Sequence, residues 1–295
     1  MKNFTDKKIS IIVPVYNGEK TIGACLSSLV AQIKNTDEII IVDNNSSDKT
    51  KEIVTKLQEK YHNIICIKEV ERGRGVARNA GVEIASGEII AMTDADCIVP
   101  PNWLAEITEP IIKQVAPAAM GFQEDVIGNY WSRERQRADY EFIVTKIKGN
   151  FIDHIDTKNF AIQSSLLKSL KFDCTLSAYE DWDLFIRAKK EGIKIFFLPN
   201  LLILHRHDAS LKQLFLTQME RGYNLAAIIK KHQNDSFFQE NFKNHESLKS
   251  RDIKNFFLFI PWALWQILTH PQRAWYQIVS DFAWKIGIIK SWIKS

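Results

Sequence analysis

The chain has 295 residues, of which 45% are hydrophobic and 25% are charged. Such a chain can bury a sizeable core, which excludes a disordered or fibrous protein. The formal net charge of +4 resides at the C-terminal end, because residues 254–295 contain five basic residues and one acidic residue. The first 253 residues are therefore formally neutral, so a general nucleic-acid-binding surface is not expected and no nucleic acid partner is predicted.

The four cysteines lie tens of residues apart without a CxxC pair, which argues against a zinc knuckle or a dense disulfide framework. The first ten residues are polar and lead into a strand pattern without the apolar region of a signal peptide. We therefore expect a cytoplasmic protein with reduced cysteines.

Short apolar, β-branched strands alternate with helical patterns over the first hundred residues. The predicted strands occupy residues 9–13, 38–42, 64–67 and 89–93. The predicted helices between them occupy residues 21–33 and 48–61 and a segment that ends at Ile84. This alternation predicts an α/β fold with a mainly parallel, Rossmann-like sheet flanked by helices, in which ligands bind beyond the carboxyl ends of the strands.

The alternation becomes less regular beyond Gly121. Further helices are predicted at residues 131–147, 179–191 and 210–231. A strand followed by a helix is predicted at residues 159–170, and another strand at residues 193–198. We assign residues 1–232 to the main α/β domain and residues 233–295 to a basic, Trp-rich, amphipathic helical extension.

The extension has the composition of a segment that binds a membrane surface. Its uncharged stretch from Phe256 to Leu268 has 13 residues, whereas a membrane-spanning helix needs roughly 20. Apolar residues between Trp275 and Ile293 fall on one helical face, and basic residues such as Lys285 lie off it. We expect residues 256–293 to contact the inner face of the cell membrane peripherally; packing against the main domain or a second subunit is the alternative.

Two carboxylates separated by one residue, Asp94 and Asp96, follow the fourth predicted strand. They are expected to project from the sheet edge into the ligand crevice. Magnesium and manganese prefer such oxygen ligands, and phosphate oxygens often complete their coordination. The pair therefore predicts a site where Mg²⁺ or Mn²⁺ meets a nucleotide diphosphate; a turn in which one aspartate caps the next helix is the alternative.

Two more strand ends carry candidate donor contacts. Asp43 could accept the imide hydrogen of a uracil, although the Asn and Ser residues after it are also typical of a turn. Gly73, Gly75 and Arg78 open a helix, where amides and guanidinium groups can hold phosphate. Arg78 replaces the third glycine of the dinucleotide-binding fingerprint, which disfavours a nicotinamide-dependent oxidoreductase. A turn with solvated arginines is the alternative.

Residues further along the chain could serve the acceptor and the metal. Asp181 could act as a general base with Glu180 orienting the acceptor or the base. Ser177 and Glu180 also match a helix capping box. His205 and His207 flank an arginine after a predicted strand, and an imidazole there could ligate a metal, contact diphosphate, or simply be a surface or core histidine.

Taken in chain order, these segments resemble the inverting family 2 glycosyltransferases with the GT-A fold. The matching segments are Val13–Glu19, Ile41–Thr50, Gly75–Gly81, Asp94–Asp96, Glu180–Asp181 and His205. Chance agreement of all six is far less probable than agreement of any one. Two positions depart from the pattern: Gln163 stands where many relatives have arginine, and Phe172–Asp173 lacks the glycine pair that often precedes it.

The resemblance implies a GT-A catalytic domain over residues 1–232, which takes a sugar from a nucleotide diphosphate sugar, a UDP-sugar being favoured. It implies transfer with inversion to a hydroxyl of a glycan or lipid-linked acceptor, in cell-surface glycan, polysaccharide or glycolipid synthesis. A catalytically silent module that binds a sugar nucleotide or a glycan is the alternative.

The resemblance also assigns a role to each candidate residue. The donor-binding residues would be Pro14, Tyr16 and Glu19 around the nucleoside, Asp43 at the base, Arg78 near the phosphates, and Asp94 at the ribose or a metal-bound water. Asp96 and His205 would ligate Mg²⁺ or Mn²⁺. Asp181 would be the catalytic base, with Glu180 orienting it or the acceptor.

Overall fold

The computed structural model describes residues 7–126, 128–206, 210–242 and 259–294. By their internal contacts these residues form two compact units. Among the described residues, the first unit draws on residues 7–126, 141–175 and 180–206, and the second on residues 128–140, 176–179, 210–242 and 259–294. Every strand of the described sheet belongs to the first unit, whereas the second unit is helical.

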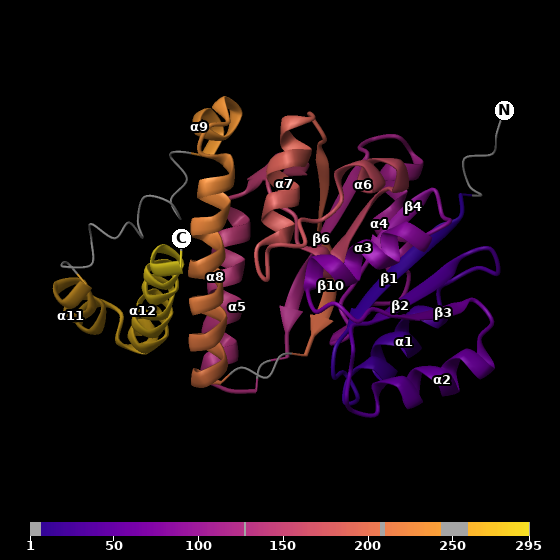
Figure 1. Cartoon of the computed structure of the whole chain (residues 1–295), viewed down its shortest axis with the longest axis horizontal. Coiled ribbons are helices and arrows are strands. Elements are labelled where there is room, and N and C mark those ends of the chain that lie inside the picture. The colour runs from indigo at the N-terminus through magenta and orange to yellow at the C-terminus, as the bar shows by residue number, and fades with distance from the viewer. Residues whose placement is uncertain (1–6, 127, 207–209, 243–258, 295) are drawn as a thin grey trace. The chain divides into compact units, whose positions relative to one another are not determined.

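Four parallel strands form one half of the sheet, in the order β3-β2-β1-β4. They are β1 (Ile9–Val15), β2 (Glu38–Asp43), β3 (Ile64–Lys68) and β4 (Ile89–Met92). All six residues of β2 are buried, as expected for a strand covered on both faces. The parallel Rossmann-like half predicted from the apolar runs is thus confirmed (Figure 1).

The second half of the sheet is mixed. It contains β9 (Phe160–Gln163), β6 (Ala118–Asp125), β10 (Ile195–His205), β5 (Cys97–Ile98), β8 (Phe151–Ile152) and β7 (Ile147–Lys148). Strand β9 lies antiparallel between β4 and β6, and β10 is parallel to β6. The two-residue strand β5 pairs antiparallel with the end of β10.

Five strands differ from the sequence expectation. Strand β6 and the two-residue strands β5, β7 and β8 were not predicted, and β10 continues to His205 rather than ending near Leu198. Its pairing with β6 shifts register between Leu198 and Leu202, where Pro199 and Asn200 interrupt the apolar pattern. An irregularity within one strand therefore resembled the end of a strand.

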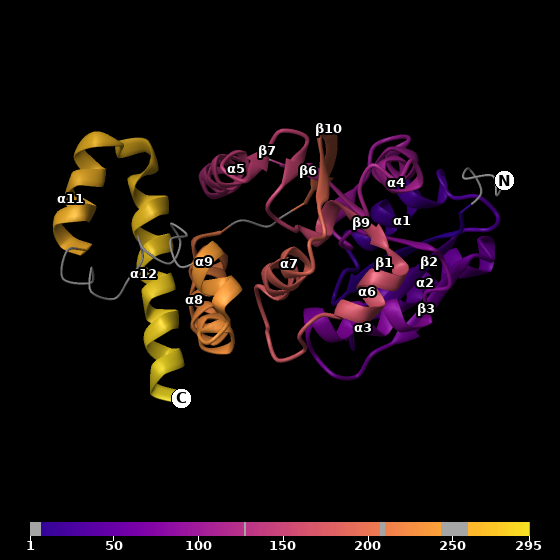
Figure 2. The ribbon, with the colours of Figure 1, turned by 90° about the horizontal axis from the view of Figure 1, so that it is seen from above.

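Helices cover both faces of this sheet. The core on one face joins β1 to α1 (Ile22–Val30), α2 (Thr50–Lys60) and α4 (Trp103–Ile112). On the other face lie α3 (Arg74–Ile84), α6 (Ser164–Leu170) and α7 (Glu180–Lys190), and Figure 2 shows α4 on the opposite side of the sheet from these three helices. Gly81 lets α3 approach β1 closely, because a Cβ there would overlap Ile12.

The second unit is built on two long helices. Its described helices are the first part of α5 (Tyr130–Val144), then α8 (Leu211–His232), α9 (Ser236–Phe242), α11 (Phe259–Thr269) and α12 (Pro271–Lys294). Helix α12 runs alongside α8 (Figure 1), and Gly222 and Gly287 bring the two backbones together, since a Cβ on either glycine would overlap the other helix. The contacts group α8 with the C-terminal helices, so a functional boundary at residue 232 remains a proposal.

Burial on α12 is not confined to the apolar face that the sequence predicts. Lys285, expected off the apolar face, is buried and paired with Asp281 at 2.6 Å. Among the described residues, no helix has both the length and the apolar character needed to cross a membrane. Residues 256–258 of the predicted membrane-contact segment, and His207, lie outside the described residues.

Candidate active site

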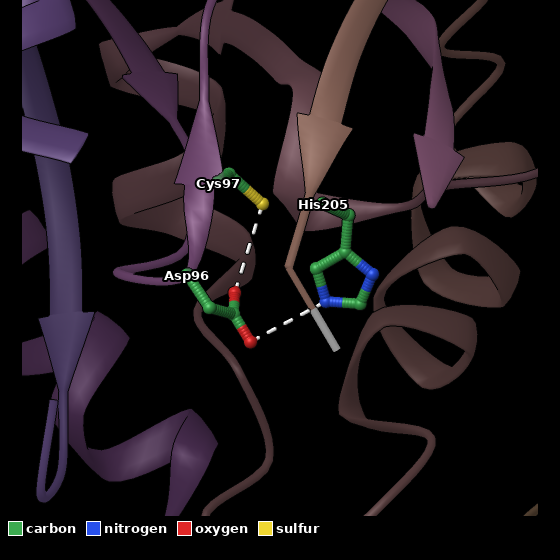
Figure 3. A group of neighbouring side chains, drawn as sticks. All are labelled: Asp96, Cys97 and His205. Atoms are coloured by element: carbon green, nitrogen blue, oxygen red, sulfur yellow. Dashed lines mark hydrogen bonds and ion pairs between the residues drawn. The ribbon is translucent and has the colours of Figure 1, made fainter. Parts of the chain in front are cut away.

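The structure brings together the two predicted metal ligands, Asp96 and His205. Asp96 lies in the turn between β4 and β5, and His205 is the last residue of β10. The antiparallel pairing of β5 with β10 sets Cys97 opposite His205, and the Arg206 backbone N–H donates to the Asp96 carbonyl at 2.8 Å. His205 Nε2 consequently lies 3.4 Å from Asp96 Oδ2 (Figure 3).

The other ring nitrogen of His205 is held by a residue that the sequence analysis missed. Asp125 ends β6, pairs with His205 in the β6–β10 register, and has its Oδ1 2.7 Å from His205 Nδ1. Both side chains are buried. A carboxylate at Nδ1 favours the tautomer whose Nε2 is free to bind a cation. The available signal was an acid at a strand end, the same pattern that identified Asp43 and Asp94.

The electrostatics of this group suit a divalent cation. Burial alone would lower the pKa of His205, but the carboxylates of Asp125 and Asp96 raise it to about 9. Burial would raise the pKa of Asp96, but the hydrogen bond and charge of His205 outweigh burial and lower it. The ring therefore carries a proton at neutral pH, which a cation bound at Nε2 would displace. One carboxylate and one imidazole at a sheet edge fit a metal whose remaining ligands are phosphate oxygens and water.

Arg78 links Asp94, a predicted donor contact, to Glu180, a predicted acceptor-side residue. It lies on α3, is 4% exposed, and donates from Nη2 to Asp94 Oδ1 at 2.9 Å and from Nη1 to Glu180 Oε1 at 2.7 Å. Burial lowers the pKa of the guanidinium, but the charges of Asp94 and Glu180 outweigh burial and raise it. The guanidinium expected near phosphate instead joins two carboxylates, while the predicted phosphate contact stays a prediction.

The first turn of α7 positions Glu180 and Asp181. Helix α7 begins at Glu180 itself, after Tyr179 with a φ of 66°. Ser177 pairs with Asn224 instead, through its backbone N–H and its side chain, and the Glu180 carboxylate accepts from Arg78. The capping-box alternative is therefore wrong, because Ser177 lies outside the helix and Glu180 faces another partner.

Asp181 has the electrostatic surroundings of a base. Burial raises the pKa of its carboxyl, and the charge of Asp156 raises it further, against the opposing charges of Lys158 and Arg78. Asp156 and Lys158 themselves form an ion pair at 2.8 Å. A carboxylate whose pKa lies above the ordinary value accepts a proton more readily from an acceptor hydroxyl. Burial likewise raises the pKa of Glu180, although Arg78 opposes it.

The predicted nucleoside-binding residues lie on neighbouring strand ends. They are Pro14 on β1, Tyr16 and Glu19 in the loop after it, and Asp43 at the end of β2. Tyr16 is exposed, and the Arg72 guanidinium lies 3.1 Å from the centroid of its ring. Glu19 Oε2 accepts from the Lys49 backbone N–H at 3.1 Å, so the two loops are tied together. Asp43 Oδ1 accepts from the Ser46 N–H at 2.9 Å, so the carboxylate takes part in the turn after β2.

Cys97 lies beside the predicted metal ligands and was not singled out from the sequence. Its Sγ is 3.7 Å from Asp96 Oδ1, on a fully buried side chain. Burial raises the pKa of the thiol well above its usual range, and the carboxylates of Asp96 and Asp94 add to the effect. The thiol is therefore protonated at neutral pH in the absence of a cation.

Comparison with known proteins agrees with this arrangement. The sequence pattern described as "Glycosyl transferase family 2" matches residues 10–171, more than half of the chain. The chain belongs to glycosyl transferase family 2. The matched segment includes Asp43, Arg78 and Asp94–Asp96, whereas Glu180, Asp181 and His205 lie beyond it.

Individual family 2 relatives differ in how much of their length is matched. The chain is 30% identical to the uncharacterized glycosyltransferase MJ1057 of Methanocaldococcus jannaschii over 67% of this chain and 70% of that protein. It is 28% identical to glycosyltransferase GlyA of Streptococcus pneumoniae over 57% of this chain, but the match spans only 26% of GlyA.

A solved structure supports the GT-A fold. The mannosyltransferase PcManGT from Pyrobaculum calidifontis, in complex with GDP-Man and Mn²⁺, superposes with a TM-score of 0.75. The comparison covers 99% of this chain and 90% of that one at 18% sequence identity, so it bears on the fold alone. The predicted fold class, a mainly parallel GT-A sheet followed by C-terminal helices, is confirmed.

Proposed function

We propose that the protein transfers a sugar from a nucleotide diphosphate sugar, with a UDP-sugar favoured, to a hydroxyl of a glycan or lipid-linked acceptor with inversion of configuration. The observation that carries this proposal is the buried network in which Arg78 joins Asp94 to Glu180, next to the base candidate Asp181. Asp96 and His205 lie at the same edge of the sheet. Family membership supports the reaction class.

In this proposal Asp181 takes the proton of the acceptor hydroxyl while the hydroxyl oxygen attacks the anomeric carbon of the donor sugar. The bond to the departing diphosphate breaks on the opposite side, so one in-line displacement inverts the configuration. General-base assistance of this kind typically contributes about 10²-fold to 10⁴-fold in rate. Glu180 orients the acceptor side, and Arg78 fixes Glu180 and Asp94 in their relative positions.

Asp96 and His205 are the residues that would hold a divalent cation, Mg²⁺ or Mn²⁺. When bound, the cation supplies positive charge that stabilises the negative charge developing on the leaving diphosphate. The Nδ1 contact of His205 with Asp125 supports this assignment, because metal-binding histidines almost always have such a partner.

We further propose that the protein works at the inner face of the cell membrane in cell-surface glycan, polysaccharide or glycolipid synthesis. Exposed apolar side chains on α11 and α12 support contact with lipid, and we call them the C-terminal apolar surface: Leu264, Trp265, Leu268, Trp275, Trp292 and Ile293. A charge contribution is weaker than the composition suggested, because Arg273 and Lys285 pair with acids of the same unit.

A panel of nucleotide sugars tests the donor half of the proposal. The matching donor should raise the melting temperature of the intact protein only when Mg²⁺ or Mn²⁺ is present, since such a shift reports binding to the folded state. Asp96→Ala should abolish the metal-dependent part of the shift. If Asp96→Ala binds donor and metal as tightly as the wild type, the metal assignment is wrong. Donor binding without any consumption in the presence of acceptors would favour the silent module.

A further inference from the structure

The two residues proposed to bind Mg²⁺ or Mn²⁺ belong to a mixed set of ligand atoms. The carboxylate of Asp96, the thiol of Cys97 and the imidazole of His205 offer one ligand atom each, all within 4.8 Å of one another (Figure 3). These are an oxygen, a sulfur and a nitrogen. Magnesium and manganese sites are typically built from oxygen, whereas thiolate and imidazole favour zinc.

The ligand atoms lie at separations close to those of a tetrahedral zinc site. With zinc bonds of about 2.3 Å to sulfur and about 2.0 Å to oxygen and nitrogen, tetrahedral angles separate oxygen from nitrogen by about 3.3 Å and sulfur from oxygen by about 3.5 Å. In the structure, Asp96 Oδ2 lies 3.4 Å from His205 Nε2, and the other oxygen, Oδ1, lies 3.7 Å from Cys97 Sγ. One ligand atom from each of the three residues lies within 4.8 Å of the other two. The three groups are therefore close enough to converge on one zinc ion once the Asp96 carboxylate turns a single oxygen towards both partners.

The backbone fixes this arrangement. Cys97 and His205 are direct cross-strand partners of β5 and β10, and Asp96 is held by the Arg206 N–H. Directly opposed residues have Cβ atoms about 4.5–5.5 Å apart, close enough for side chains to share one ion. Cys97 and His205 are buried, but the side chain of Asp96 is 38% exposed, so solvent reaches the cluster at its carboxylate.

We propose that Asp96, Cys97 and His205 form a three-ligand site for a thiophilic divalent cation, Zn²⁺, which excludes Mg²⁺ and Mn²⁺ from the same residues. The fourth tetrahedral position remains for water or a phosphate oxygen. As zinc binds, the Cys97 thiol becomes a thiolate and its proton passes to solvent. Zn²⁺ exceeds Mn²⁺ in general affinity for such ligands, so zinc acts as an inhibitor of the proposed transferase. This consequence rests on the proposed function, but the binding itself does not.

Cobalt titration of the full chain without nucleotide tests the site directly. Co²⁺ bound through Cys97 should give a thiolate-to-cobalt charge-transfer absorption, which stoichiometric Zn²⁺ should abolish by displacement. Cys97→Ser should remove the band and weaken Zn²⁺ at least tenfold, because even the loss of an outer partner of a ligand costs about 10-fold to 100-fold. Mn²⁺ affinity should change less than about threefold, because Mn²⁺ prefers oxygen ligands. Cys66→Ser, which removes a half-buried thiol on β3, should keep the band.

The wild-type protein alone can refute the proposal, whatever the folding of the variants. Absence of the charge-transfer band at stoichiometric Co²⁺ overturns the site, and so does a band that persists in folded Cys97→Ser. A second measurement asks whether prior loading with Zn²⁺ blocks Mn²⁺ binding; independent binding of both ions overturns the shared site. A zinc-binding chain that consumes no nucleotide sugar would keep this site and reject the transferase, whereas consumption without the band would do the reverse.

Discussion

The two units of the chain differ in which side chains they bury and which they expose. In the first unit, charged groups are buried and paired: Arg78, Asp125, Glu180 and His205 are each about 4% exposed and bonded to one another or to Asp94 and Asp96. In the second unit, large apolar groups stay exposed, with Leu268 82% and Trp275 63% accessible. Buried charge and exposed apolar surface each carry a free-energy cost, which points to function in both units.

The difference predicts that chemistry and location are separable. Substitutions among the buried charges should change catalysis or metal binding without affecting attachment to membranes. Substitutions on the C-terminal apolar surface should do the opposite. The predictions below test this separation from the largest effect to the smallest.

Asp181→Asn should lower the rate of sugar transfer by about 10²-fold or more, because the amide cannot accept the proton of the acceptor hydroxyl. Donor binding should remain close to that of the wild type. The measurement is donor consumption in the presence of acceptor, beside donor-induced thermal stabilisation. Glu191→Gln, at an exposed acid just beyond α7, is the control and should retain full activity. An active Asp181→Asn protein would remove Asp181 from the mechanism.

Asp125→Asn should weaken Mn²⁺ binding by about 10-fold to 100-fold, because Asp125 orients the ring of His205 and increases its basicity. Titration of the protein with Mn²⁺, followed by electron paramagnetic resonance, measures the affinity. Glu124→Gln alters the neighbouring residue of β6, which is exposed, and should leave the affinity unchanged. Equal affinities for the two variants would mean that Asp125 has no role at the metal.

The affinity for Mn²⁺ should fall about tenfold for each unit that the pH drops between 8 and 6. His205 has a pKa of about 9 in the absence of a cation, so over this range each bound ion displaces one proton from the ring. Affinity rises with pH and levels off above about 9, where the ring is already neutral. Calorimetric titrations in buffers of different ionisation enthalpy would count the protons released. A pH-independent affinity would show that Nε2 is not a ligand.

Local sequence patterns predicted the features that depend on neighbouring residues. Continuous apolar runs identified β1 to β4, and acids at their ends identified Asp43, Asp94 and Asp96. The missed features depend on pairings between distant strands. Asp125 and His205 are 80 residues apart and meet only through the β6–β10 register. Cys97 lies opposite His205 only because β5 pairs with β10, a pairing that the local sequence does not predict.

The second unit was harder to predict for a related reason. A helical wheel finds one apolar face on α12, but it cannot find the contact in which Gly287 lies against α8. That contact buries Lys285, whose charge is offset by Asp281 one turn earlier. Composition therefore overstated the basic charge that is available to a membrane.

Ser in place of Leu268 and Ile293 should lower recovery on vesicles containing anionic lipid by about threefold to tenfold, since each buried apolar side chain contributes roughly 1.5–3 kcal/mol and interfacial burial is partial. Flotation of the full chain is the measurement. Point substitutions are preferable to truncation before α12, because truncation would expose the face of α8 that α12 covers. Val70→Ser, at a 69% exposed residue of the first unit, is the control. Unchanged flotation of the double variant would favour a protein partner for this surface.

The smallest expected effect bears most directly on the contrast between the units: Asp181→Asn should be more stable than the wild type at neutral pH. The pKa of Asp181 is raised in the folded state, so the folded chain binds this proton more tightly than the unfolded chain. The resulting stabilisation is complete below the pKa that Asp181 has in the unfolded chain, and it is lost as the pH rises through the pKa that Asp181 has in the folded chain.

At pH 7 the ionised carboxylate of Asp181, beside the charge of Asp156, therefore destabilises the fold, and the amide of Asp181→Asn removes that penalty. The melting temperature of Asp181→Asn should therefore exceed that of the wild type at pH 7, and the difference should vanish at acid pH, where the wild-type group is protonated. Leu268→Ser should leave the melting temperature unchanged, because its side chain contributes little to packing. A loss of stability in Asp181→Asn at pH 7 would mean that favourable contacts hold the carboxylate, as they would hold a structural residue. That result would count against Asp181 as a catalytic base whose ionised form lowers the stability of the fold.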